Sequence, residues 1–162
     1  LGDKTTFPTD NDTEERQRFA RSTHEYLIEQ VQATGVEQIS GTSDKIRLDF
    51  NHPVKELIWT APGMTKSKLE LNGHDRFTER DSEYFSMVQQ YQHHTNQASD
   101  VFVYSFALEP ENLQPSGTCN FSRIDNANLT IKGSGLSEAR VYGLNYNVLR
   151  VQNGMGGLAY SN

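Results

Sequence analysis

The chain has 162 residues, enough for one domain with a hydrophobic core, a net charge of −6 and a pI near 5.3. Its Lys and Arg residues are scattered instead of clustered, which disfavours a nucleic-acid-binding surface. A single cysteine excludes a scaffold stapled by internal disulfides, and no apolar stretch approaches the ~20 residues that a membrane-spanning helix needs.

The beginning of the chain is predicted to be a linker or arm. Leu1–Asp12 is polar without periodicity, and a chain that does not start with Met is expected to be part of a longer protein. Thr13–Arg21 can form a short helical turn. His24–Gln32 is ambiguous by its residues alone: an apolar spacing of four fits a helix face, whereas Tyr26 and Ile28 alternate as in a strand.

The following segments show the alternation of strands. Ile46, Leu48 and Phe50 are separated by charged residues, which predicts a half-buried strand. Further apolar runs and the turns that separate them follow in chain order: a break at Asn51–Pro53, the run Val54–Ala61 with the only tryptophan, a turn at Pro62–Gly63, the alternating Leu69–Leu71, and a turn at Asn72–Gly73.

A short helix is predicted next. Thr78, with Asp81 three residues later, resembles a capping box at its start. The charged residues between Glu79 and Glu83 are interpreted as the solvated face of this helix. The apolar residues expected on its other side are Tyr84, Phe85 and Val88.

The most strand-like run is Val101–Leu108, which has large apolar residues at even positions and small residues at odd ones. Neither face is charged, which favours an inner strand over an edge strand. Glu109–Gly117 contains two prolines and a glycine, so it is predicted to be a loop. A second strand is expected to run from Cys119 to Ile131, with a bulge or tight turn near Asp125.

A long last strand is predicted over Tyr142–Val148, followed by the glycine-rich Asn153–Gly157 and a short strand over Leu158–Tyr160. Seven or eight strands with glycine-rich turns indicate an all-β sandwich or barrel, with one or two short helices in loops. By the residues alone, a jelly roll of two four-stranded antiparallel sheets and an immunoglobulin-like sandwich both stay open.

No residue is assigned as catalytic, cofactor-binding or metal-binding. His93 and His94 are adjacent and would point to opposite faces of a strand, while the other three histidines stand apart, so hydrogen bonds to loops or subunit contacts are the preferred interpretation. Cys119 is expected to be a small core residue. A calcium-loop-like start at Asp10 fails at its sixth and twelfth positions, Glu15 and Arg21.

Three sequons for N-glycosylation begin at Asn11, Asn120 and Asn128. The last two lie on predicted strands, where transferase access is poor, and the pattern is frequent by chance. All three are expected to be unmodified.

Four stretches of the chain carry a resemblance: HEYLIEQVQ (His24–Gln32), the segment Leu71–Asn96, YSFALEPENLQPSGTCNFSRIDNANL (Tyr104–Leu129) and Asn145–Asn162. In this order they are similar to the C-terminal part of the major capsid proteins of nucleocytoplasmic large DNA viruses, of the chlorovirus and iridovirus type. The resemblance covers roughly Thr13 to the end. It favours a strand at His24–Gln32 and a jelly roll over the immunoglobulin-like sandwich.

The resemblance implies a structural subunit, not an enzyme. Residues 1–23 would be an arm from a preceding N-terminal jelly roll, and residues 24–162 the C-terminal jelly-roll domain. Such chains form homotrimers of pseudo-hexagonal outline that tile an icosahedral shell with neighbouring capsomers and possible minor capsid proteins. The expected location is the virion, after assembly in the host cytoplasm, without direct nucleic-acid contact, membrane span or cofactor. The loops expected to be free for neighbours are Gly73–Arg76, Tyr91–Asn96 and Glu109–Gly117.

Two alternatives remain. A lectin-like jelly-roll module would need surface aromatics and carboxylates that converge on a groove, and the sequence shows no such cluster. A cupin-like metalloenzyme would need two histidines two residues apart on one strand, which is not the spacing of His93 and His94.

Overall fold

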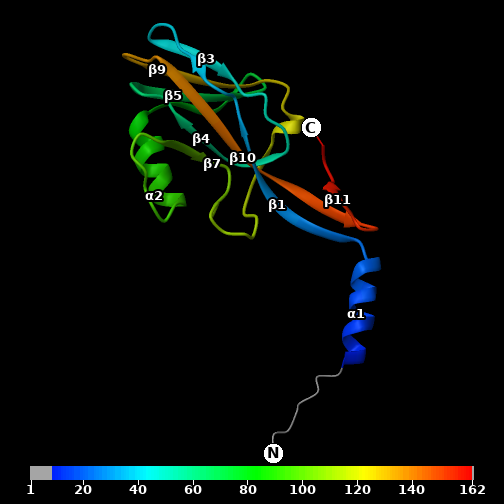
Figure 1. The fold of residues 1–162 in the computed structure, drawn as a ribbon. Coiled ribbons are helices and arrows are strands. Elements are labelled where there is room, and N and C mark those ends of the chain that lie inside the picture. The colour runs from blue at the N-terminus through cyan, green and yellow to red at the C-terminus, as the bar shows by residue number, and fades with distance from the viewer. Residues whose placement is uncertain (1–8, 162) are drawn as a thin grey trace, which may run out of the picture. The chain divides into compact units, whose positions relative to one another are not determined.

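The computed structural model describes residues 9–161, with side chains from Thr13 onward (Figure 1). Two compact units are distinguished. The sandwich unit is Glu29–Tyr146, and the terminal unit comprises Leu1–Ile28 together with Asn147–Asn162. The strands β1 (His24–Ala33) and β10 (Glu138–Gln152) have residues in both units, and the strand predicted at His24–Gln32 is confirmed.

The remaining elements complete an all-β chain with few helices. The helical segments are α1 (Thr9–Arg21), a π-helical turn (Tyr84–Val88) that continues into α2 (Gln89–His93), and a 3-10 turn (Phe121–Arg123). The other strands are β2 (Glu37–Gln38), β3 (Ser43–Arg47), β4 (Pro53–Thr60), β5 (Met64–Leu71), β6 (His74–Asp81), β7 (Phe102–Ser105), β8 (Cys119–Asn120), β9 (Ala127–Gly133) and β11 (Met155–Leu158).

These strands form two antiparallel sheets, which confirms the predicted all-β sandwich. One sheet has the strand order β1-β10-β4-β7, with β2 and β11 paired to β10 and β8 paired to β4. The other has the order β3-β9-β5-β6. The first sheet has more strands than the four predicted for each sheet. Its strands β2 and β8 have only two residues each, which is too short to show an alternation in the sequence.

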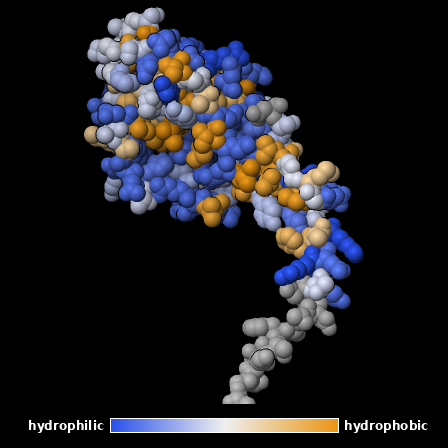
Figure 2. All heavy atoms as spheres, viewed as in Figure 1, coloured by the Kyte–Doolittle hydropathy of each residue, from blue (hydrophilic) through white to orange (hydrophobic). Residues whose placement is uncertain are grey.

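The terminal unit exposes much of its apolar surface. Its strand segments come from β1, β10 and β11, and Arg150 Nε donates to Glu25 Oε1 at 2.8 Å. Tyr26 and Leu27 are both exposed, so neither face of β1 is covered there. In Figure 2, apolar residues gather on the surface where Figure 1 places β1 and β11. The other exposed apolar residues of this unit are Phe19, Met155, Leu158 and Tyr160.

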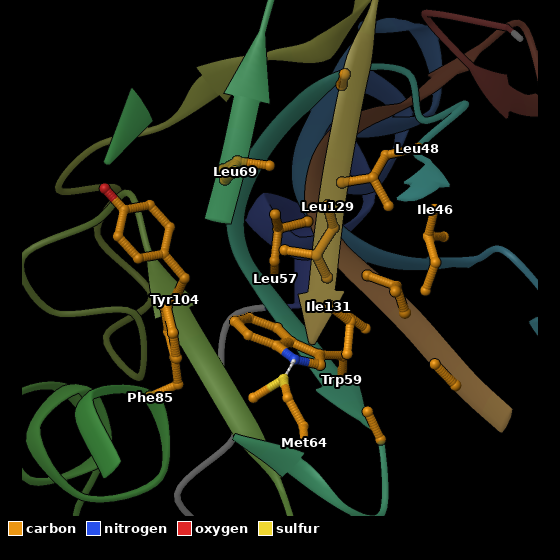
Figure 3. Packing of buried hydrophobic residues seen from close by; sticks show 14 of the residues in the cluster. Ile46, Leu48, Leu57, Trp59, Met64, Leu69, Phe85, Tyr104, Leu129 and Ile131 are labelled. Carbon is orange, nitrogen blue, oxygen red and sulfur yellow. Dashed lines mark hydrogen bonds between the residues drawn. The ribbon is translucent and has the colours of Figure 1, made fainter. Parts of the chain in front are cut away.

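The hydrophobic core belongs to the sandwich unit and lies between its two sheets (Figure 3). Trp59 of β4 is fully buried, and its Nε1 donates to the Met64 sulfur at 3.4 Å. Its ring packs against Phe85, which anchors the π-helical turn, with ring centroids 5.1 Å apart. Other fully buried members of the core are Leu57, Leu69, Leu129 and Ile131.

The strand predicted from Cys119 to Ile131 is two strands in different sheets. β8 pairs with β4 and β9 pairs with β3 and β5, so the predicted break is the point where the chain crosses from one sheet to the other. Asn72, in the hairpin turn between β5 and β6, fixes this crossing. Its backbone N–H donates to the Asn126 carbonyl at 2.7 Å, and its side-chain oxygen accepts from the N–H of Asp125 at 2.9 Å.

The prediction that Val101–Leu108 is an inner strand was wrong. β7 spans only Phe102–Ser105, stands last in its sheet and pairs with β4. Its open edge is met by a buried side chain, because Gln89 of α2 accepts from the Ser105 N–H at 3.0 Å. An edge strand with an edge covered by a helix can be as apolar as an inner one.

The predicted capping box was also wrong. Thr78 and Asp81 lie in strand β6, and the charged run interpreted as a helix face is mostly on this exposed strand. The helical segment begins later, at Tyr84, without a side-chain cap. Phe85 is buried as expected, but Val88 is exposed. The helical turn predicted at Thr13–Arg21 is longer than expected, since α1 begins at Thr9.

The last strands follow the prediction with shifted boundaries. β10 is longer than predicted, and its most buried alternate residues include Ala139, Val141 and Asn145 instead of the larger residues between them. Gly143 explains part of this, because a Cβ there would lie 3.0 Å from the Phe50 ring. The short final strand is β11, which begins at Met155, earlier than predicted.

Candidate functional site

Two charged residues in the middle of β4 are the starting point of the candidate site. Lys55 and Glu56 are only 2% and 3% exposed. β4 has a bulge here, because Leu144 pairs with Glu56 whereas the next residue of β10 pairs with Val54. Val54 and Leu57 are both fully buried in the core, so the two charged residues between them interrupt the alternation.

Lys55 is neutralised by direct contacts. Its Nζ lies 2.5 Å from Glu29 Oε1 and donates to the Pro110 carbonyl at 2.6 Å. The ammonium also lies 5.5 Å from the centre of the Tyr146 ring. A buried ammonium needs such partners, since an unpaired one would lose several kcal/mol of hydration. Lys55 therefore fixes the loop that contains Pro110.

Glu56 is held by histidine. His94 Nε2 lies 2.9 Å from Glu56 Oε2, and His94 Nδ1 lies 3.3 Å from Glu111 Oε1. Burial raises the pKa of Glu56 above its ordinary value, although the charge and hydrogen bond of His94 lower it in part. One imidazole thus bridges two carboxyl groups.

Glu111 also receives two bonds from Thr95. The Thr95 N–H donates to Oε1 at 3.0 Å, and the Thr95 hydroxyl donates to Oε2 at 2.5 Å. These bonds are the main reason that the pKa of Glu111 is lowered. A further contact joins His93 Nδ1 to the Leu108 carbonyl at 3.0 Å.

The structure thereby brings together two of the three segments predicted to be free loops, although residues 91–93 belong to α2, so the loop prediction was wrong for them. Residues 93–95, at the end of α2, are bonded to residues 108–111, and together they line a hollow of about 310 Å³. Their bonds to each other show that they are one surface. We call this surface, which consists of residues 91–96 and 108–117, the loop platform. Its most exposed apolar side chains are Tyr91, Leu108 and Leu113.

The third predicted loop lies elsewhere in the fold. Gly73 forms the turn, with a φ of +78°, but His74 to Arg76 belong to strand β6, so the loop prediction was wrong for them. Arg76 lies over the Phe106 ring, with its guanidinium carbon 5.9 Å from the ring centre.

Three of the histidines and the cysteine have structural contacts. His93 and His94 bond to loops as anticipated, and His24 Nε2 lies 2.6 Å from the Phe19 carbonyl. Among the described residues, no group of three His, Cys, Asp or Glu side chains is placed to hold a metal ion. Cys119 is half-buried against the core, and burial raises the pKa of its thiol. The side chain of Asp10, where the calcium-like pattern starts, lies outside the described residues.

Two of the three sequons can be placed. Asn128 is buried in β9 and donates to Asn126 Oδ1 at 2.7 Å. Asn120 is exposed, and its Oδ1 accepts from the Ser122 N–H at 3.1 Å. The side chain of Asn11 lies outside the described residues. That these asparagines are unmodified stays a prediction.

Sequence reasoning missed Lys55 and Glu56. The signal was present, since a Lys-Glu pair stands between the apolar residues of Val54–Trp59. Buried charges are rare unless paired, so two of them inside a strand indicate partners elsewhere in the chain. The identity of those partners, which lie on strand β1 and on two distant loops, has no local sequence signal.

No helix in the described part of the chain is long and apolar enough to cross a membrane.

Comparison with known proteins gives a consistent result. The family described as large eukaryotic DNA virus major capsid protein matches residues 15–66 and 60–157. The major capsid protein of Pyramimonas orientalis virus is 49% identical, over 93% of this chain and 46% of that protein. The major capsid protein of Paramecium bursaria Chlorella virus 1 is 37% identical, over 93% of this chain and 52% of that protein.

Solved structures agree on the fold. A quasi-atomic model of the PBCV-1 virus capsid superposes with a TM-score of 0.82 and 36% identity, over 93% of this chain and 55% of that one. This likeness confirms the jelly-roll sandwich. The Faustovirus major capsid protein, at 11% identity and a TM-score of 0.64, shares the fold alone. The chain spans about half the length of the curated relatives it matches.

Proposed function

Because the chain belongs to the family of major capsid proteins of nucleocytoplasmic large DNA viruses, we propose that it forms one of two jelly rolls in a subunit of an icosahedral capsid. The observation that carries this proposal is the 49% identity to a major capsid protein over 93% of the chain. The proposed role is structural, not enzymatic, as for relatives named as capsid proteins.

We propose the following division of the chain. Residues 1–23 are the arm from a preceding N-terminal jelly roll, and residues 24–162 are the C-terminal jelly-roll domain. Two observations support a second domain in the same protein. The curated relatives are about twice as long as the chain, and the terminal unit exposes apolar side chains on both faces of β1. Such a surface is typical of an interface with another domain.

The proposed assembly is a closed ring of subunits. We propose a homotrimer with a pseudo-hexagonal outline, which packs against neighbouring capsomers and possible minor capsid proteins in the virion after assembly in the host cytoplasm. A closed three-fold ring has head-to-tail contacts, so each subunit uses two different patches. The loop platform, which is exposed and partly apolar, is our candidate for one of them. The net charge of −6 gives no reason to expect direct contact with nucleic acid.

The solution mass of the full-length gene product tests this proposal. Light scattering on a sizing column should give three times the mass of one full-length chain. A well-behaved monomer would contradict the capsomer assignment, and glycan binding and metal content would then be measured to test the lectin-like and cupin-like alternatives.

A further inference from the structure

The two contacts of His94 depend on how many protons the imidazole and the two carboxyl groups hold together. An ionised carboxylate can only accept hydrogen bonds, and a neutral imidazole has one N–H to donate. His94 faces a carboxyl oxygen at each ring nitrogen, Glu56 Oε2 at 2.9 Å and Glu111 Oε1 at 3.3 Å. Both contacts can be hydrogen bonds only when the three groups together hold one proton more than a neutral imidazole and two carboxylates supply.

The surroundings favour this extra proton. Burial raises the pKa of Glu56, so its carboxylate is a costly neighbour unless a proton or a positive charge lies next to it. The pKa of Glu111 is lowered by the Thr95 bonds, which keeps Glu111 as an acceptor. The other charged groups facing Glu56 are Lys55, which is paired with Glu29, and His93.

The cluster joins two segments that are far apart in the sequence. Helix α2 ends at His93, so residues 93–95 span its end, and residues 108–112 lie in the loop after β7. The other bonds that hold the loop are those of the Leu108 and Pro110 carbonyls to His93 and Lys55. Leu108 is 75% exposed, whereas the Pro110 side chain is fully buried, so polar bonds hold the residues on either side of one apolar anchor.

We propose that Glu56, His94 and Glu111 form a proton-dependent clamp that holds the loop 108–112 against the end of α2 and releases it as the pH rises. Loss of the extra proton leaves a ring nitrogen lone pair facing a carboxylate, which replaces a hydrogen bond by repulsion. The raised pKa of Glu56 acts in the same direction, because a carboxyl that binds its proton more tightly in the folded state loses that contribution as the pH rises through its folded pKa.

The clamp has a consequence for assembly, which rests on the proposed function. Leu108 and Leu113 lie on the clamped loop, and Tyr91 lies on the facing segment. Release of the loop would change the shape of the loop platform and weaken contacts with a neighbouring subunit. The clamp itself can be tested without reference to assembly.

Hydrogen–deuterium exchange of the full-length protein is the test, from about pH 5.5 to about pH 8.5. Labelling times are scaled to the intrinsic exchange rate at each pH. The protection of amides in residues 106–116 should fall about tenfold across this window, as expected for loss of a hydrogen bond to a charged group. The protection of the core strand β9 should stay constant and reports that the protein remains folded.

The variant Glu111→Gln distinguishes the clamp from a general effect of pH. A glutamine amide nitrogen in the place of Oε1 can donate to the ring nitrogen of a neutral imidazole, and the amide oxygen then accepts from the Thr95 hydroxyl. The Thr95 N–H loses its acceptor in this variant, which lowers the protection of the loop equally at every pH. The protection should then no longer fall as the pH rises. Glu109→Gln is the matched control, since Glu109 lies in the same loop and bonds Asn112 instead of His94. This control should keep the wild-type pH dependence.

Several results would overturn the clamp. Flat protection in the wild type would show that no proton is lost, and an unchanged pH dependence in Glu111→Gln would show that the lost proton is not in this cluster. A flat profile in Glu109→Gln would show that loop charge alone matters. None of these results depends on the trimer, whose mass is measured separately.

Discussion

At the scale of single residues, the chain places two charges where apolar side chains are usual. Lys55 and Glu56 are buried in β4, and each is satisfied by groups from distant segments. Replacing a well-paired buried charge by an apolar group can be harmless, whereas removing one partner leaves the other without compensation. Removal of Lys55 should therefore lower the stability of the fold more than removal of a lysine on the surface.

Lys55→Met should lower the free energy of unfolding by about 1–3 kcal/mol, because Glu29 and the Pro110 carbonyl lose a charged donor. The expected loss in the free energy of unfolding is modest, since Glu29 is partly exposed and water can solvate it. Lys45→Met is the matched control. Its ion pair with Glu70 is on the surface, so a change within about 0.5 kcal/mol is expected. Urea unfolding measures both, and equal losses would contradict the role assigned to Lys55.

At the scale of elements, alternation predicted the strands wherever one face is buried. Ile46, Leu48 and Phe50 are buried as predicted, although β3 ends before the last two. Prediction failed where long-range pairing decides the structure. The crossing between β8 and β9 was visible only as a slip in the alternation, because strand partners are set by contacts far along the chain.

The same limit applies to the candidate site. Two of its loops were predicted from proline, glycine and the family resemblance, but their bonds to each other were not. The capping box at Thr78 failed because the pairing of β6 with β5 overrides a local helix signal. The bulge that turns Lys55 and Glu56 away from the core also depends on the register with β10.

One close approach between elements should be sensitive to a single methyl group. A Cβ on Gly133, at the end of β9, would lie 2.0 Å from the carbonyl oxygen of Gly63. Gly133→Ala should lower the stability by about 2–3 kcal/mol, because backbone must move to relieve the clash. Gly157→Ala in β11, where nothing lies within 4 Å, should be nearly neutral. Thermal unfolding compares the two, and a neutral Gly133→Ala would contradict this packing.

At the scale of the whole molecule, two regions gather exposed apolar side chains, besides single exposed residues elsewhere such as Val36 and Met87. The terminal unit exposes Tyr26, Leu27 and Leu158, and the sandwich unit exposes Tyr91 and Leu113 on the loop platform. Exposed apolar groups that gather over one region are typical of interaction surfaces. Under the proposed function, the first set would contact a second jelly roll of the same protein and the second set would contact neighbouring subunits.

A charged residue introduced on the loop platform should impair trimer formation without unfolding the domain. Leu113 is 89% exposed and Tyr91 is 79% exposed, so Leu113→Asp and Tyr91→Asp should leave the melting temperature within about 2 °C. Light scattering should show loss of the trimer. Val36→Asp, an exposed apolar site outside the platform, is the control and should assemble normally. Normal trimers in both platform variants would count against this surface.

The two outer strands of the β3-β9-β5-β6 sheet are built in a way that opposes aggregation when the protein is present at high concentration. Among residues 9–161, β3 and β6 each have one edge without a paired strand, and both are rich in charged residues, such as Lys45, Arg47, Asp75 and Arg80. Open strand edges are templates for uncontrolled edge-to-edge pairing with strands of other chains, and charges along them suppress it. In the assembly that we propose, these charges would keep the sheets of newly made subunits apart while the assembly surfaces find their partners.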